Sequence, residues 1–124
     1  MMSKKRILHV ELTTLGGALQ HFARTWDEAA AGKAVKPYEG VSFETMEEFL
    51  SAFTPRRWAL IRELSGAGPV TIYALAKQLN RDYKNVHGDV AVLMNLGVIA
   101  KDADGRVSVP YDEIEARLPL GVAA

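Results

Sequence analysis

The feature that most constrains the fold is a central block, residues 54–110, in which three helix-start signals precede a hairpin turn. Thr54 and Pro55 can begin a helix, because the threonine oxygen accepts a hydrogen bond from a free N–H group and proline has no N–H to leave unpaired. Thr71 and Asp82 are capping residues of the same kind, and an apolar pattern at helical spacing follows each of them. The central block therefore predicts three consecutive helices followed by a pair of strands.

The end of the central block has the signals of a two-stranded hairpin. Gly97 suits the left-handed position that closes a helix predicted over residues 82–96. An Asp-Gly pair at 104–105 supplies the positive φ of a tight turn between strands at 98–101 and 106–109. Helices that cross at a tight turn, with a hairpin after them, form a winged helix-turn-helix domain. The predicted fold class is α+β, mainly α: a winged helix-turn-helix domain with an N-terminal strand–helix extension.

The residues before the central block predict that extension. Residues 7–13 are rich in β-forming residues and alternate weakly, so a short strand is expected, and residues 40–43 predict a second one. Thr45 and Glu48 match a capping box, which predicts a short helix after Thr45. Between the two strands, apolar residues at spacings of three and four predict a helix with one apolar stripe. The stripe consists of Leu15, Leu19, Phe22 and Trp26.

The C-terminal residues leave a short strand and an irregular tail both open. Ile114, Ala116 and Leu118 alternate with polar residues, and Pro119 argues against a long helix. The predicted organisation is therefore an extension over residues 1–44, a winged helix-turn-helix domain over 45–111 and a C-terminal strand or tail over 112–124.

Composition places the chain among cytoplasmic single-domain proteins. It has 124 residues, of which 48% are hydrophobic, so it can bury a core of its own. It has no cysteine, which excludes disulfides and thiolate zinc sites and fits a reducing compartment. No apolar run approaches the roughly 20 residues of a membrane-spanning helix, and the apolar run after the basic start is too short for a signal peptide. We therefore expect no membrane contact.

The common catalytic motifs are missing. The sequence has no nucleophile elbow, no P-loop and no His-Glu pair at metal-binding spacing. His87 stands alone at the border of the predicted helix core, where a histidine is usually a packing and hydrogen-bonding residue. His9 and His21 are too far away in the sequence to complete a ligand set. The chain is therefore predicted not to be an enzyme and to need no cofactor and no metal.

Charge is unevenly distributed along the chain. The net charge is zero overall, but the central block carries eight lysines and arginines against five acidic residues. The remaining residues carry seven basic against ten acidic ones, so the basic excess lies where the three helices are predicted. This distribution favours a polyanionic partner for the central block.

A helical wheel on residues 82–96 separates two faces. Val86, Val90 and Leu93 fall on one side, and Tyr83 falls toward the same side and is expected to be partly buried. The opposite face has short side chains apart from one lysine, and it contains no acidic residue. It consists of Lys84, Gly88, Ala91 and Asn95, with Asn85 on one flank. A face of this kind suits close approach to phosphates and base edges.

With the pairs Arg81-Asp82, Val86-His87 and Asp89-Val90, the segment over residues 53–114 resembles the small prokaryotic winged helix-turn-helix transcriptional regulators, distant relatives of the regulators that sense drugs and metals. The family more often has a basic residue at the position of Gly88. The resemblance implies DNA binding as a dimer, and some members look antitoxin-like. The shared residues are Thr54-Pro55, Arg57-Trp58, Leu75-Ala76, Arg81-Asp82, Val86-His87, Asp89-Val90, Leu93, Gly97, Asp104-Gly105 and Val109-Pro110-Tyr111.

The predicted function is that of a sequence-specific DNA-binding transcriptional regulator. Residues 82–96 would lie in the major groove of double-stranded DNA, and the wing over 98–109 would lie on the adjacent backbone. Arg81, Lys84 and Asn85 are the expected leading contacts, and acidic neighbours weaken the expected contact of the wing. The full set of candidate DNA-binding residues is Thr71, Arg81, Tyr83, Lys84, Asn85, Gly88, Lys101 and Arg106.

Two alternatives use the same fold. The stripe formed by Leu15, Leu19, Phe22 and Trp26 is longer than a capping helix needs, so we expect it to form a homodimer interface or a partner-binding surface. In the first alternative, the chain is an antitoxin whose N-terminal half binds a toxin while the winged helix represses the operon. In the second, the winged helix is a protein-interaction adaptor that does not bind DNA.

Overall fold

The computed structural model of the chain describes residues 5–13, 23–24, 26–27, 30–32 and 39–120. Within these residues, helices, one parallel sheet and one small hairpin make an α+β fold, as the sequence predicts. The elements are β1 (Ile7–Leu12), β2 (Gly40–Phe43), α2 (Met46–Ala52), α3 (Pro55–Ala67), α4 (Ile72–Leu79), α5 (Tyr83–Asn95), β3 (Ala100–Lys101), β4 (Val107–Ser108) and β5 (Glu113–Arg117).

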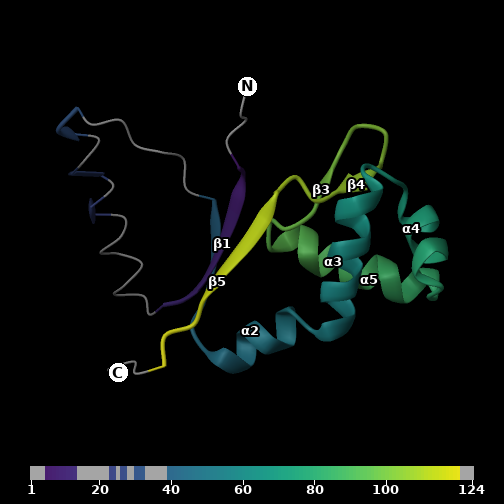
Figure 1. Ribbon diagram of the computed structural model, residues 1–124, viewed down its shortest axis with the longest axis horizontal. Coiled ribbons are helices and arrows are strands. Elements are labelled where there is room, and N and C mark those ends of the chain that lie inside the picture. The colour runs from purple at the N-terminus through teal and green to yellow at the C-terminus, as the bar shows by residue number, and fades with distance from the viewer. Residues whose placement is uncertain (1–4, 14–22, 25, 28–29, 33–38, 121–124) are drawn as a thin grey trace.

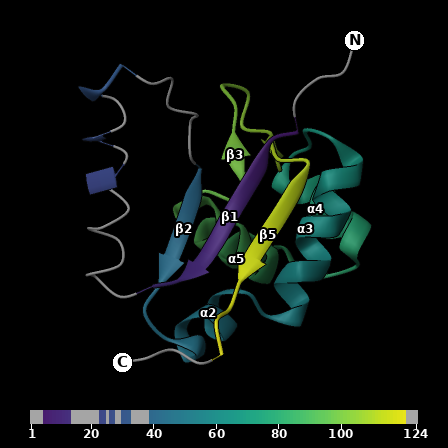
Figure 2. The same cartoon turned by 60° about the vertical axis from the view of Figure 1, so that its left-hand side comes forward.

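The N-terminal and C-terminal strands meet in one sheet. Its order is β2-β1-β5, and both pairings are parallel, with Leu8 beside Ile114 and Val10 beside Val41. Figure 2 shows the three strands side by side in front of the helices. In Figure 1 the sheet lies on one side of the molecule, α3, α4 and α5 lie on the other, and α2 connects the two below. The predicted extension and tail are therefore two parts of one sheet.

Local capping chemistry fixes the start of each of these helices. Every N-cap side chain accepts a hydrogen bond from the backbone N–H three residues later, which satisfies a donor that the helix itself leaves unpaired. The caps that the sequence predicts are therefore confirmed. They are Thr45 for α2, Thr54 for α3, Thr71 for α4 and Asp82 for α5.

The hairpin is shorter than the sequence predicts. Only Ala100 and Lys101 pair with Ser108 and Val107, because Val98 and the residue after it turn into the core. Residue Val70, just before α4, forms an antiparallel bridge to the other edge of β4. The hairpin is thereby attached to the start of α4.

The core is continuous from the sheet to the helices. A group of aromatic rings joins them: Phe43 of β2 lies 5.8 Å from Phe49 of α2, and Phe53 stacks on Trp58 of α3 at 5.0 Å between ring centroids. Such ring pairs contribute about 0.5–1.5 kcal/mol beyond the area they bury. The remaining buried positions include Leu8, Val10, Leu60, Leu64, Leu75, Val86, Val90, Leu93, Val98 and Val107.

One arginine ties the starts of the three parallel strands together. The Arg6 guanidinium binds the Glu39 carboxylate with two hydrogen bonds of 2.6 and 2.8 Å, and it lies 4.9 Å from the centre of the Tyr111 ring. The Arg6 backbone N–H donates to the Asp112 carboxylate. The hydrogen bonds from Arg6 hold the pKa of Glu39 below its usual value. Burial and the Glu39 carboxylate raise the pKa of Tyr111.

The predicted apolar stripe is described only in part. Trp26 belongs to a helical segment and its side chain is 65% exposed, so it is not a core residue within the described structure. Leu15, Leu19 and Phe22 lie outside the described residues. Across the described ranges, the helices are too short and too polar to cross a membrane.

Candidate functional site

The tight turn between α4 and α5 fixes where α5 begins. Asn80 adopts the left-handed conformation, with φ of 53°, and its N–H donates to the last carbonyls of α4. The next residue, Arg81, donates its N–H to the carbonyl of Ala76 at 3.0 Å. The Asp82 carboxylate then accepts from the N–H of Asn85 at 3.3 Å and caps α5. An asparagine tolerates this conformation better than most residues, so the chain can turn within two residues.

The inner side of α5 is held by apolar packing. Val86, Val90 and Leu93 are fully buried against α3, α4 and the hairpin, as the helical wheel predicts. Burying a side chain of this size stabilises the fold by roughly 1.5–3 kcal/mol. The helix is therefore fixed along its length by residues that have no direct role at the surface.

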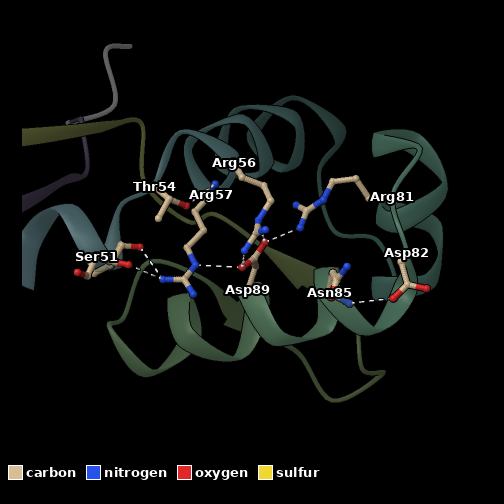
Figure 3. A network of polar contacts seen from close by, with 9 residues as sticks. Ser51, Thr54, Arg56, Arg57, Arg81, Asp82, Asn85 and Asp89 are labelled. Atoms are coloured by element: carbon tan, nitrogen blue, oxygen red, sulfur yellow. Dashed lines mark hydrogen bonds and ion pairs between the residues drawn. The ribbon is translucent and has the colours of Figure 1, made fainter.

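An arginine–aspartate cluster, made of Arg56, Arg57, Arg81 and Asp89, adds a polar anchor (Figure 3). Asp89 of α5 is only 3% exposed. One carboxylate oxygen accepts from Arg57 at 3.0 Å and from Arg56 at 3.3 Å. The other accepts from Arg81 at 2.7 Å and from Arg56 at 3.1 Å. One buried carboxylate thus joins the start of α3, the turn before α5 and α5 itself.

The cluster keeps Asp89 ionised. Burial by itself would raise the pKa of the Asp89 carboxyl group, because a low-dielectric environment disfavours the charge. The hydrogen bonds from the three guanidinium groups act in the opposite direction, and the pKa lies below its usual value. A carboxylate with this exposure and no such partners would strongly destabilise the fold.

The cluster also reaches the end of α2. The Arg57 guanidinium donates to the carbonyls of Ser51 and Ala52, both at 3.0 Å. These carbonyls lie in the last turn of α2, where the helix itself supplies no partners. Arg57, with 16% of its side chain exposed, is therefore a structural residue that connects α2, α3 and α5.

Arg81, expected to be a leading DNA contact, has its guanidinium turned toward Asp89. Its side chain is 19% exposed, and its Nη1 atom is buried without a hydrogen-bond partner among the described residues. The sequence patterns did not predict this cluster. The available signal was the aspartate itself, because a buried acidic side chain requires a cationic partner.

The outer face of α5 is open. Lys84, Gly88, Ala91 and Asn95 are all exposed, and so is Asn85 on the flank. A Cβ atom built on Gly88 would meet nothing within 4 Å. The fold of the isolated chain therefore gives no steric reason for a glycine at this position.

Tyr83, expected to be partly buried, is among the exposed large side chains of the described structure, with 47% of it accessible to solvent. Tyr83 is the first residue of α5, and the fully buried side chains of the helix begin only three residues later, at Val86. The Tyr83 ring instead lies 5.9 Å from the ring of His87, one helical turn away. His87 is also exposed, so it packs on a neighbouring side chain at the surface and not at the core border.

The hairpin residues lie beside α5. An open hollow of about 440 Å³ separates α4, α5 and β3, and its lining includes Ile72, His87 and Lys101. In the turn, the Asp102 carboxylate accepts from the N–H groups of Asp104 and Arg106, both at 2.9 Å. Asp102 is therefore used to hold the turn, while Lys101 and Arg106 remain exposed.

The last expected contact, Thr71, uses its hydroxyl oxygen to accept from the N–H of Ala74 at 3.1 Å. The residue itself is exposed at the start of α4. Over the part of the chain that the structure describes, no three His, Asp or Glu side chains gather in a way that could hold a metal ion.

Comparison with known proteins identifies a family. Searches of curated proteins and of solved structures found no similar protein. A family model described as HVO_A0114 matches residues 52–116, a little more than half of the chain. The matched segment contains α3, α4, α5 and the hairpin, and with them every member of the arginine–aspartate cluster. The chain belongs to the HVO_A0114 family.

Proposed function

We propose that this chain is a sequence-specific DNA-binding transcriptional regulator of the winged helix-turn-helix class, with α5 as its recognition helix. The observation that carries the proposal is the contrast across α5. Its inner side is anchored by buried side chains and a buried ion-pair cluster, while its outer face is exposed and has no acidic residue. A rigid helix with a free, weakly basic face matches the width and chemistry of the major groove.

Lys84 and Asn85 are the leading contacts in this proposal. Lys84 lies in the first turn of α5, and no ion pair holds its side chain within the described residues. It can bind phosphate as a mobile point charge. Asn85 projects from the adjacent flank, and its amide has the donor and acceptor that recognise adenine. Gly88, one turn from Lys84, lets the helix backbone approach the DNA closely.

Arg81 has a supporting role in the proposal. Its guanidinium binds Asp89, so it holds the turn that sets the direction of the first turn of α5. We assign the corresponding phosphate contact to Lys84. Tyr83 lies at the exposed start of the same helix, where its ring can cover a sugar or phosphate at the groove edge.

The wing and the start of α4 supply backbone contacts. Lys101 and Arg106 are exposed on the hairpin, and Lys101 shares the hollow beside α5. Although the Thr71 hydroxyl is used as a cap, the remaining free N–H groups at the start of α4 favour an anion such as phosphate. These contacts position the protein and carry no sequence information.

The proposed active form is a homodimer. Two copies of α5 would then meet half-sites about one helical turn apart, roughly 34–36 Å. The exposure of Trp26 supports a surface of the N-terminal half as the interface. The expected result of light scattering on the full chain is twice the 13.6 kDa mass of one chain, with Trp26→Ser shifting the equilibrium toward monomer. A wild-type mass of one chain at micromolar concentration contradicts the dimer.

Selection of bound fragments from genomic DNA tests the function directly. Wild-type protein is expected to enrich one sequence, and log affinity for that duplex should fall linearly as log salt concentration rises. If the protein binds no duplex, or if its binding does not depend on salt concentration, the proposal is overturned and a protein-interaction adaptor is favoured.

A further inference from the structure

The arginine–aspartate cluster has more positive charge than its own carboxylate can neutralise. Three guanidinium groups surround one aspartate, and each Asp89 oxygen already accepts two hydrogen bonds. A carboxylate has about four acceptor positions, so Asp89 is saturated. The cluster therefore keeps a net positive charge, and those of its N–H donors that bind neither Asp89 nor the α2 carbonyls need an acceptor from outside the cluster.

Exposure singles out one of the three arginines. The side chains of Arg57 and Arg81 are 16% and 19% exposed, whereas that of Arg56 is 58% exposed. Arg56 uses Nε and Nη2 on Asp89, which leaves Nη1 without a partner within the described residues. The Arg56 guanidinium is thus held in place on one side and open to solvent on the other.

The Arg56 guanidinium extends from α3 and lies beside α5, where a partner of that helix can reach it. Asn85 and Asp89 are four residues apart on one helix, so their side chains lie on the same edge, about 6 Å apart along the axis. In Figure 3 the Arg56 guanidinium lies over Asp89, one turn beyond Asn85. When a helix lies in the major groove, its edges face the phosphates that line the groove.

We propose that Arg56 contacts a phosphate of the DNA backbone on the Asn85 edge of α5, and that Asp89 is the residue that positions it. This inference rests on the proposed DNA-binding function and adds to that site a contact from α3. Prior fixing of the guanidinium by Asp89 reduces the side-chain entropy lost on binding, which a free surface lysine would lose in full.

Arg56→Ala tests the inference, with Arg62→Ala as its matched control. Arg62 lies on the same helix, is exposed and makes no ion pair within the described residues, so both variants remove one surface charge from α3. Binding of each full-length protein to the duplex selected by the wild type is measured by fluorescence anisotropy at several salt concentrations. Arg56→Ala is expected to weaken binding about tenfold at low salt and to reduce the salt slope by about 0.9, whereas Arg62→Ala changes neither.

Arg56→Lys separates the charge from its positioning. It keeps a cation but cannot keep the two-point contact with Asp89, so a near wild-type salt slope with reduced affinity is expected. It also keeps the test decisive if Arg56→Ala fails to fold.

The outcomes distinguish this inference from the proposed function. If Arg56→Ala and Arg62→Ala both bind the duplex with wild-type affinity and with equal salt slopes, the phosphate contact is overturned, while the proposed DNA binding stands. Reduced affinity at an unchanged slope also overturns it, because that result shows a purely structural effect. Wild-type protein that shows no salt-sensitive duplex binding overturns both.

Discussion

The two sides of α5 differ in almost every respect. The inner side carries fully buried valines and a leucine together with Asp89, whose carboxylate is bound by three arginines. The outer face carries Lys84 and Gly88, which are both exposed, and a Cβ atom built on Gly88 would meet nothing within 4 Å. The two sides therefore meet different requirements. The residues of the inner side hold the helix in its position, and the residues of the outer face are available to bind a partner. Changes on the inner side should therefore alter stability, and changes on the outer face should alter binding.

The largest effect is expected from Asp89→Asn. Removing one member of a buried ion-pair network leaves uncompensated charge, so the free energy of unfolding should fall by about 3 kcal/mol. Urea unfolding followed by circular dichroism measures this change. Glu63→Gln is the control, because Glu63 is exposed on α3 and its replacement should shift stability by less than about 0.5 kcal/mol. A loss at Asp89 no larger than the loss at Glu63 would mean that the cluster does not anchor α5.

A smaller effect is expected from pH. The folded-state pKa of Asp89 is lowered, so its stabilising contribution is complete above the usual aspartate pKa of about 3.9 and is lost as pH falls through the lower folded-state value. The stability difference between wild type and Asp89→Asn should therefore be constant from pH 7 to 5 and shrink below about pH 4. Urea unfolding at pH 7, 5, 4 and 3 gives the comparison. A difference that stays the same at pH 3 would show that Asp89 titrates as it does in the unfolded chain.

The next effect is a gain. Gly88→Ala should raise the free energy of unfolding by about 1 kcal/mol, because alanine favours the helix and nothing lies within 4 Å of the added Cβ. Gly66→Ala in α3 is the matched control, since its Cβ would also meet open space. Both variants should gain stability, but only Gly88→Ala should weaken binding to the selected duplex, because the helix backbone approaches DNA there. Equal DNA affinities for the two variants would remove the close-approach explanation of Gly88.

The sequence predicted what depends on neighbouring residues. The helix starts at Thr54, Thr71 and Asp82 follow from the chemistry of a few adjacent positions, and the structure confirms them. The direction of each side chain around α5 follows from helical geometry alone. The exposure of Tyr83 does not, because an angle on a wheel says nothing about how far the core extends along the helix.

Contacts between distant residues could not be predicted in the same way. Ile7 pairs with Glu113 across most of the chain, and periodicity indicates a strand without indicating its neighbour or its direction. The arginine–aspartate cluster joins residues that are 8, 32 and 33 positions apart. Its charged members lie on α3, on α5 and in the turn between α4 and α5, so only the folded structure shows that the Arg81 guanidinium faces Asp89.

The most direct test of the account compares two double variants in unfolding and in DNA binding. Lys84→Ala with Asn85→Ala removes the proposed leading contacts, and Arg62→Ala with Ser65→Ala removes one charge and one polar group from exposed positions of α3. We predict that both proteins unfold within about 0.5 kcal/mol of the wild type. Only the first should lose affinity for the selected duplex, by at least about tenfold, with a salt slope reduced by about 0.9. If the Lys84 and Asn85 variant binds that duplex as tightly as the wild type, the outer face of α5 is not the DNA-binding surface.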